Sequence, residues 1–315
     1  MTKKSMGIHH ITAIVGDPQE NVDFYAGVLG LRLVKKTVNF DDPDTYHLYF
    51  GDKTAKPGTI ITFFPWGNAY KGKIGDGQVG VTTYAVPTGA LAFWEKRLQK
   101  FEIPFSKTTR FEERYLAFDD PHGLHLELVE RQSGQLNNWE TQEVTEDVAI
   151  KGFGGATLYT ANAEKTAELL ETVLGLEKIG EEHDLLRFRA ANDLGNIIDV
   201  KLSPVGTGQM GVGTVHHIAW RAKDDADQLD WKEQIETYGL GVTPVQDRQY
   251  FNAIYFREYG DILFEIATDP PGFAIDEPQE SLGEALMLPE QYETHRKNIQ
   301  RNLPPIRVKN LKSKK

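Results

Sequence analysis

Hydrophobic and polar residues along the chain predict one order of strands and helices, and this order occurs four times. Residues 8–64 show it first: an apolar-rich run predicts a strand, an amphipathic stretch predicts a helix, and three shorter runs predict strands. Residues 79–130, 153–203 and 213–268 repeat the same order. The pattern therefore predicts four βαβββ modules in tandem, which belong to the α+β fold class.

An internal duplication supports this organisation. The residues VLGL at positions 28–31 recur at positions 173–176, at the end of an amphipathic helix in both copies. The glycine in each copy is a natural C-terminal stop for a helix. Before the first copy, Asp17 is a good N-cap and Pro18 suits the first helical position.

The four modules group into two sequence halves joined by a polar segment. We expect an N-terminal half over residues 1–131, a linker over 132–151 and a C-terminal half over 152–270. A tail over residues 271–315 is expected to carry one helix, at 289–302.

Composition and charge exclude several classes of protein. The 315 residues carry 35 Lys and Arg against 46 Asp and Glu, a net charge of −11, which argues against a nucleic-acid partner. No apolar run approaches the ~20 residues of a membrane helix, and the N-terminus lacks the apolar stretch of a secretory signal. Cysteine is absent, so a metal would have to be held by histidines and carboxylates. We therefore expect a cytoplasmic protein with no membrane partner.

Two of the four modules open with a pair of histidines, His9-His10 and His216-His217. In a regular strand neighbouring side chains point to opposite faces, so one histidine of each pair is expected to face inward. Glu265 lies in an apolar strand of the fourth module, where a carboxylate is costly unless it is paired or bound to a metal. The strand pattern by itself does not decide which histidine of each pair faces inward.

The number of candidate ligands bears on the type of reaction. Glu127 matches Glu265 in the second module, but that module opens without a histidine, so we expect a structural carboxylate there. The matching strand of the first module, residues 60–64, has no carboxylate. Modules one and four thus offer two histidines and one carboxylate, the set typical of non-haem Fe(II) oxygenases that leave positions open for substrate and oxygen.

Other side chains carry weaker signals. The remaining histidines are expected to be structural or to lie at the surface: His47, His122, His125, His183 and His295. Three aromatic residues, Phe63, Phe64 and Trp66, either form an apolar wall for an aromatic ring or pack in the core.

Several segments of the chain resemble a known family. They lie at residues 9–12, 19–25, 28–38, 46–51, 215–219, 247–251, 255–257 and 264–269. The most specific stretch is VLGLRLVKKTVNFDDPDTYHLYFGD, which begins at residue 28. In these segments the chain resembles the vicinal-oxygen-chelate superfamily, and within it the type I extradiol ring-cleaving dioxygenases that open hydroquinones.

This resemblance implies a vicinal-oxygen-chelate fold, in which the four modules pair into two half-barrel-like curved sheets. It implies that the second histidine of each pair is a metal ligand, namely His10 and His217, with Glu265 as the carboxylate. The implied metal is Fe(II), and Mn(II) is also possible. It further implies catalytic roles near the substrate for His9, His216, Tyr255, Arg248 and Thr12.

The activity implied by the resemblance is cleavage of hydroquinone or catechol-like aromatics with O2. The implied roles are aromatic degradation and quinone detoxification. The resemblance is also compatible with a homo-oligomer. The same scaffold also carries glyoxalase-type isomerases and thiol transferases, because a fold does not fix a function. An isomerase usually needs a second carboxylate on the metal, which residues 60–64 lack. A third alternative is a protein that sequesters an aromatic compound without a metal.

Overall fold

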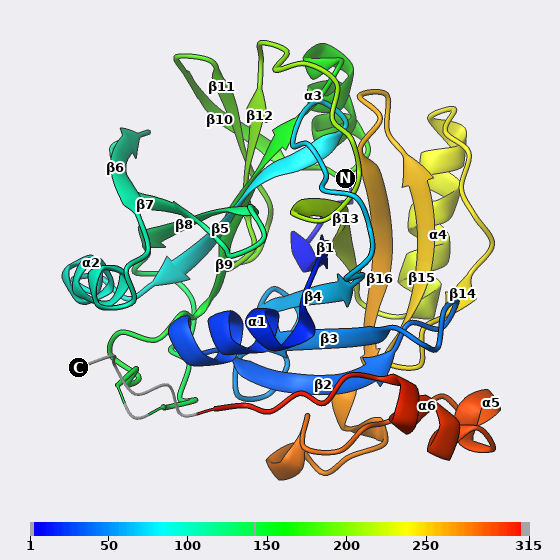
Figure 1. Cartoon of the computed structure of the whole chain (residues 1–315). Coiled ribbons are helices and arrows are strands. Elements are labelled where there is room, and N and C mark those ends of the chain that lie inside the picture. The colour runs from blue at the N-terminus through cyan, green and yellow to red at the C-terminus, as the bar shows by residue number, and fades with distance from the viewer. Residues whose placement is uncertain (1–2, 142, 310–315) are drawn as a thin grey trace.

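The computed structural model describes residues 3–141 and 143–309. Parts of three expected segments lie outside the described residues: positions 1–2 of the first half, 142 of the linker and 310–315 of the tail. Within the described residues, sixteen strands form two eight-stranded sheets (Figure 1). Each sheet curls into a half-barrel, and the expected α+β class is confirmed.

The four βαβββ modules pair across the chain: modules one and four build the first sheet, and modules two and three build the second. The strands of the first sheet are, in spatial order, β14 (Gln246–Asp247), β15 (Phe251–Arg257), β16 (Leu263–Pro271), β13 (Thr214–Ala222), β1 (Ile8–Val15), β4 (Ile60–Pro65), β3 (Tyr46–Gly51) and β2 (Arg32–Val38). The strands of the second sheet are, in spatial order, β10 (Glu177–Glu182), β11 (Leu185–Arg189), β12 (Ile197–Lys201), β9 (Gly152–Tyr159), β5 (Gln78–Val86), β8 (His125–Glu130), β7 (Glu113–Asp119) and β6 (Phe105–Arg110). Each module's first strand runs parallel to its last strand, and the two modules of a sheet meet in an antiparallel pair.

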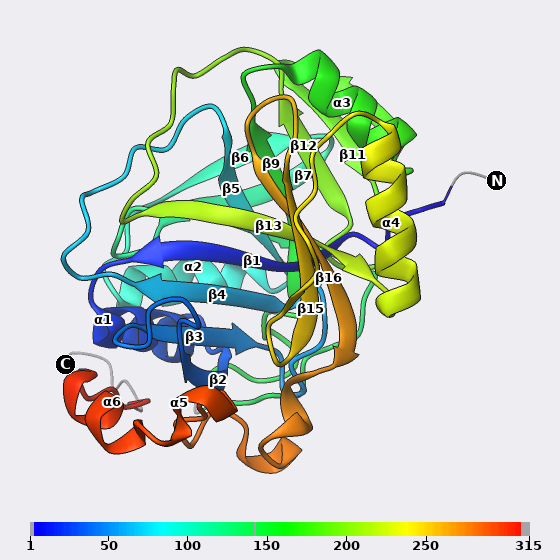
Figure 2. The same ribbon diagram turned by 90° about the vertical axis from the view of Figure 1, so that its right-hand side faces the viewer.

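Helices pack along the sheets. They are α1 (Pro18–Val22), α2 (Leu91–Lys100), α3 (Ala163–Thr172), α4 (Asp225–Thr237), α5 (Glu290–Glu293) and α6 (Arg296–Asn302), with 3-10 turns at Phe273–Ile275 and Gln279–Ser281. α4 packs on β13, β15 and β16 and covers the outer side of the first sheet (Figure 2). Among the helices of the described ranges, none has both the length and the apolar character needed to cross a bilayer.

The first helix begins where the sequence predicts but changes its winding. After α1 the chain continues as a π-helix over Asp23–Val28, in which the N–H of Leu29 donates to the carbonyl of Phe24 at 2.9 Å. This wider winding turns four of its six side chains into the core: Phe24, Tyr25, Ala26 and Val28.

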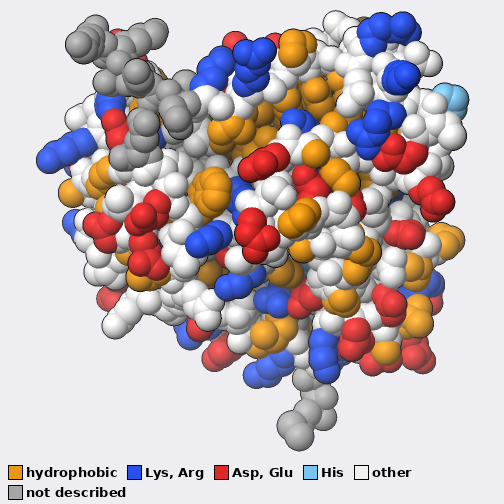
Figure 3. All heavy atoms as spheres, turned by 90° about the horizontal axis from the view of Figure 1, so that it is seen from below, with side chains coloured by type: hydrophobic (Ala, Val, Ile, Leu, Met, Phe, Trp, Pro, Cys, Tyr) orange, Lys and Arg blue, Asp and Glu red, His pale blue; other side chains and the backbone are white. Residues whose placement is uncertain are grey.

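The tail differs from the expected single helix at 289–302, because it forms the two short helices α5 and α6. α5 buries no side chain and α6 buries only Ile299, so little apolar contact is available to hold one longer helix. The segment before them is anchored instead by Lys35, which is fully buried and binds Asp276 at 2.5 Å and Glu277 at 2.6 Å. On the face drawn in Figure 3, acidic and basic side chains of the described residues are interspersed.

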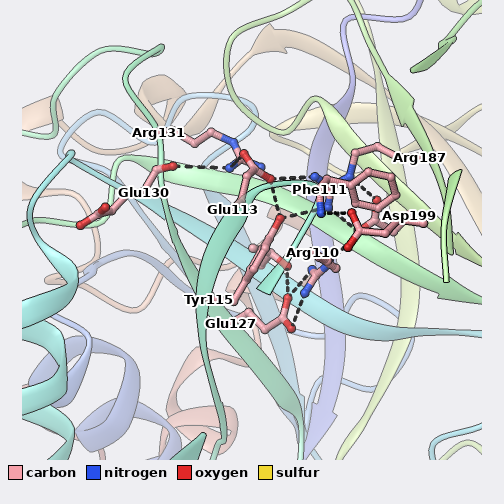
Figure 4. A network of polar contacts seen from close by, with 11 residues as sticks. Arg110, Phe111, Glu113, Tyr115, Glu127, Glu130, Arg131, Arg187 and Asp199 are labelled. Atoms are coloured by element: carbon pink, nitrogen blue, oxygen red, sulfur yellow. Dashed lines mark hydrogen bonds and ion pairs between the residues drawn. The ribbon is translucent and has the colours of Figure 1, made fainter. Parts of the chain in front are cut away.

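The second sheet carries a network of buried ion pairs around Glu127 (Figure 4). Arg110 donates two hydrogen bonds to the Glu127 carboxylate, at 2.9 and 2.6 Å, and Thr83 donates a third at 3.0 Å. Arg187 makes a similar two-point contact with Asp199, at 2.6 and 2.7 Å. Glu127 is thus paired with an arginine, as expected for a structural carboxylate.

Candidate metal centre

Two histidines and a glutamate from three neighbouring strands meet in the first sheet. His10 lies on β1, His217 on β13 and Glu265 on β16, and these strands stand side by side. The two Nε2 atoms are 3.3 Å apart. Glu265 Oε2 lies 2.8 Å from His217 Nε2 and 3.5 Å from His10 Nε2. All three residues are buried, so their ligand atoms face one another away from bulk water.

The three side chains fit a metal ion. Ligand atoms bound at ~2.1 Å and at right angles to one another lie ~3.0 Å apart, close to the observed spacing. Glu265 is 0% exposed, and neither of its oxygens accepts a hydrogen bond of good geometry from a described residue. A buried carboxylate without donors is costly, and a divalent cation would compensate its charge. Within residues 3–141 and 143–309, this is the one group of three such side chains with ligand atoms within 4.8 Å.

The first histidine of each doublet touches the ring of the second. The pairing of β1 with β13 shifts register at His9 and again at His216, where one strand carries an extra residue. Such bulges redirect side chains, so the expected alternation of faces fails at both doublets. His9 Nδ1 lies 2.9 Å from His10 Nδ1, and His216 Nδ1 lies 2.7 Å from His217 Nδ1. These contacts orient each ring and leave its Nε2 directed at the cluster.

Burial and neighbouring groups set the protonation states that a metal requires. Burial lowers the pKa of His217, although the adjacent Glu265 opposes this. Burial and the contact with His217 lower the pKa of His216 to about 3. Burial alone would raise the pKa of Glu265, but His10 and His217 facing it lower that pKa below its usual range. Neutral imidazoles and an ionised carboxylate are the forms that bind metals.

The first and fourth modules place different residues at equivalent positions of the centre. In the fourth module Glu265 pairs with Ala219, two residues beyond His217. In the first module the residue two beyond His10 pairs with Thr62 in the same way. Thr62 therefore stands where a second carboxylate would lie. Among the described residues, the centre thus has two imidazoles and one carboxylate, and the position of a fourth ligand is taken by the hydroxyl-bearing Thr62.

A cavity of about 420 Å³ opens onto this cluster, a volume typical of small-molecule sites (~300–1,000 Å³). Six Phe, Tyr and Trp residues contribute to its wall: Phe40, Tyr49, Phe64, Trp66, Phe251 and Tyr255. Phe64 and Trp66 stack with their ring centroids 5.4 Å apart. Phe63 points the other way along the strand and is fully buried in the core, so only two of the three expected wall residues face the cavity.

Most of the residues expected near the substrate line this cavity. They are Thr12, His216, Arg248 and Tyr255. His9 lies behind His10 and is not part of the lining. Arg248 donates to Gln246 Oε1 at 2.6 Å and lies 3.5 Å from the carboxylate of Asp41, while its guanidinium sits 5.7 Å from the Tyr255 ring centroid.

His47 and Tyr49 are among the residues of the cavity wall that were not predicted from the sequence. His47 was expected to be a structural or surface residue, and the structure places it in the cavity lining beside the cluster. Burial lowers the pKa of His47 well below its ordinary value, and the nearby His10 adds to this effect. The signal was available in the alternation of β3, since residues 47 and 49 share one face and the strand pairs with the one that carries Thr62.

Two curled sheets of paired βαβββ modules and a two-histidine, one-carboxylate centre define one class of protein. The chain belongs to the Glyoxalase/Bleomycin resistance protein/Dioxygenase superfamily, whose family model matches residues 7–128 and 152–276. The matched ranges include His10, His217 and Glu265.

The names of individual relatives are more specific than that of the superfamily. The chain is 69% identical over 311 residues to "Putative ring-cleaving dioxygenase MhqO" of Bacillus subtilis, covering 99% of this chain and 100% of that protein. It is 36% identical over 299 residues to "Chlorohydroquinone/hydroquinone 1,2-dioxygenase" of Sphingobium indicum, covering 91% and 92% of the two chains. A crystal structure described as a "putative dioxygenase" from Bacillus subtilis superposes with a TM-score of 0.97 at 69% identity, covering 98% of this chain and 100% of that one.

Proposed function

We propose that this protein is a metal-dependent extradiol ring-cleaving dioxygenase that opens hydroquinone or catechol-like aromatics with O2, with Fe(II) as its resident metal. The observation that carries the proposal is Thr62, which occupies the place of a second carboxylate ligand. Three protein ligands leave several positions of an octahedral ion open, as a reaction that joins an aromatic substrate to oxygen requires. The printed names of the relatives support the same reaction class.

His10, His217 and Glu265 would hold the metal, and His9 and His216 would fix the orientation of the two ligand rings. When bound, the ion supplies a Lewis acid and a template for the aromatic substrate and oxygen. Two imidazoles and one carboxylate suit Fe(II), and Mn(II) binds similar ligands.

The other residues of the cavity wall act on the aromatic substrate itself. A dihydroxyaromatic that loses a phenolic proton becomes an anion, and Arg248 provides a fixed positive charge beside Tyr255 to stabilise it. Burial raises the pKa of Tyr255, and the nearby Glu265 raises it further, so its hydroxyl keeps its proton and can donate to a ring oxygen. Phe64 and Trp66 provide an apolar surface that excludes water from the bound ring.

Oxygen uptake after anaerobic loading with Fe(II) tests this proposal. With methylhydroquinone or catechol, we expect uptake that depends on iron and yields a ring-opened chromophore. A Glu265→Ala variant should show neither. If iron is bound and neither substrate consumes oxygen, the proposal fails, and conversion of the hemithioacetal of methylglyoxal and glutathione would then identify a glyoxalase-type isomerase.

A further inference from the structure

A chain of four hydrogen-bonded side chains runs along the wall that the first module contributes to the cavity. The Tyr49 hydroxyl lies 2.8 Å from His47 Nδ1, and His47 Nε2 lies 2.7 Å from Thr62 Oγ1. Thr62 Oγ1 in turn lies 3.0 Å from Thr12 Oγ1. Each of the four groups can both donate and accept a hydrogen bond, so the chain is continuous.

Both ends of this chain face the cavity. Thr12 and Tyr49 line it, as does His47 between them, whereas Thr62 is not part of the lining; Thr12 and Thr62 are both 0% exposed. Thr12 lies two residues beyond His10 on β1, next to the metal cluster. Tyr49 pairs with Thr62 as Tyr255 pairs with Glu265, so the two tyrosines occupy equivalent positions in the two modules. The chain thus connects the neighbourhood of the metal with a second point of the cavity wall.

In the fourth module, the position equivalent to His47 carries no imidazole. The residue two before Tyr255 is Ala253, whereas the residue two before Tyr49 is His47. A neutral imidazole has one donor nitrogen and one acceptor nitrogen, and here each nitrogen has a hydroxyl partner. The hydrogen bonds that link the four side chains can therefore all point from Tyr49 towards Thr12 or all point the other way. Reversing their direction transfers, in effect, one proton from one end of the series to the other.

We propose that Tyr49, His47, Thr62 and Thr12 form a proton relay between two points of the substrate cavity. This inference rests on the proposed function, because it supplies proton transfers to a dihydroxyaromatic substrate. A phenolic proton of the bound substrate passes to the Tyr49 oxygen while the Tyr49 proton moves to His47 Nδ1. The His47 Nε2 proton moves to Thr62, that of Thr62 moves to Thr12, and that of Thr12 moves to an oxygen of the reacting molecule beside the cluster.

This step is balanced in protons and involves no electrons. Each of the four groups gives one proton and receives one, so none is left charged and no co-reactant is needed. The substrate loses a proton at one oxygen, and an oxygen at the other end gains one. Proton transfer by positioned groups contributes ~10²–10⁴-fold to enzymatic rates, so interruption of the chain should lower kcat strongly.

A matched pair of variants tests the relay at Thr62. Thr62→Val keeps the shape of the side chain and removes the hydroxyl, whereas Thr62→Ser keeps the hydroxyl. With iron-loaded protein, methylhydroquinone and O2, we expect Thr62→Val to lower kcat by ~10²-fold, with KM and iron content little changed. Thr62→Ser should stay close to the wild type, and Tyr49→Phe should resemble Thr62→Val. The solvent deuterium isotope effect on kcat should change in Thr62→Val and not in Thr62→Ser.

A second readout does not depend on turnover. Nitrogen NMR of the His47 ring, in zinc-loaded protein without oxygen, reports which nitrogen carries the proton. We expect binding of methylhydroquinone to move that proton between the two nitrogens in the wild type and not in Thr62→Val. An unchanged ring in the wild type, or wild-type kcat in Thr62→Val, would overturn the relay. Absence of turnover in the wild type would instead count against the proposed function, and the NMR result would still decide the relay.

Discussion

Replacing each of two buried glutamates by glutamine should distinguish the contribution of the metal centre to stability from that of the ion-pair network around Glu127. Glu265 and Glu127 lie on the last strands of their modules, and both are buried. Glu265 faces two histidines, whereas Glu127 is held by Arg110 and Thr83. We expect Glu265→Gln to abolish stabilisation by metal and Glu127→Gln to leave that stabilisation intact.

The size of the metal effect follows from linkage. Metal at 100 times its Kd stabilises the folded wild type by ~2.7 kcal/mol, which raises Tm by ~4 °C. Loss of an outer partner of a ligand weakens metal binding by ~10–100-fold, so loss of the only carboxylate in the cluster should weaken it by at least ~100-fold. The same metal concentration would then stabilise Glu265→Gln by only ~0.4 kcal/mol, or ~1 °C in Tm.

The matched control has an opposite signature. Glu127→Gln removes the carboxylate that accepts two hydrogen bonds from Arg110, and breaking a buried ion pair typically costs ~3–5 kcal/mol. Arg110 keeps Asp199 at 3.0 Å, so we expect a smaller loss of ~2–3 kcal/mol and a Tm lower by roughly 3–5 °C.

Thermal unfolding with and without Mn(II) measures both effects, and Mn(II) is a convenient probe because it is stable in air. We expect a Tm rise on adding Mn(II) in the wild type and in Glu127→Gln, and almost none in Glu265→Gln. A full Mn(II) response in Glu265→Gln would refute the assignment of the centre. Loss of the Mn(II) response in Glu127→Gln would refute the expectation that metal binding does not depend on the ion-pair network around Glu127.

Three further changes probe the centre and its wall. His217→Ala should lose both bound iron and oxygen uptake, since it removes one of three ligands; retention of iron and turnover would contradict the ligand set. Tyr255→Phe should slow turnover by ~10²–10⁴-fold with iron content unchanged, and loss of iron instead would assign Tyr255 to metal binding. Thr62→Glu should supply a fourth ligand at the position equivalent to Glu265, so that Mn(II) binds more tightly in calorimetry while oxygen uptake falls; unchanged affinity and uptake would contradict that equivalence.

The modular fold could be predicted from the sequence because strands and helices of each module follow a simple hydrophobic pattern. The candidate ligands were likewise visible as histidine doublets at equivalent module starts and a carboxylate in an apolar strand. The choice within each doublet came from a family resemblance. The geometry of the doublets could not be predicted, because the bulges at His9 and His216 arise from the pairing of β1 with β13, which are about 200 positions apart in the chain.

Other differences also arise from contacts between distant segments. His47 became part of the cavity only when β3 paired with β4 and brought it beside Thr62. The helix after α1 winds as a π-helix that buries four of its six side chains, whereas the periodicity of the sequence predicts a regular helix. The tail lacks the apolar face that would hold one long helix and is anchored through buried Lys35 instead. These features depend on tertiary contacts, or on their absence, which local patterns in the sequence do not contain.

If the protein cleaves the ring with O2 as we propose, both oxygen atoms enter the opened product, and labelled oxygen tests this most directly. Iron-loaded protein would be mixed with methylhydroquinone under ¹⁸O2, and the product would be examined by mass spectrometry after correction for exchange with water. We predict a ring-opened product that carries the label in the wild type and no such product in Glu265→Gln. An unlabelled quinone as the sole product, with iron bound, would mean that oxygen only accepts electrons from the substrate, and it would contradict the assignment of this protein as a ring-cleaving dioxygenase.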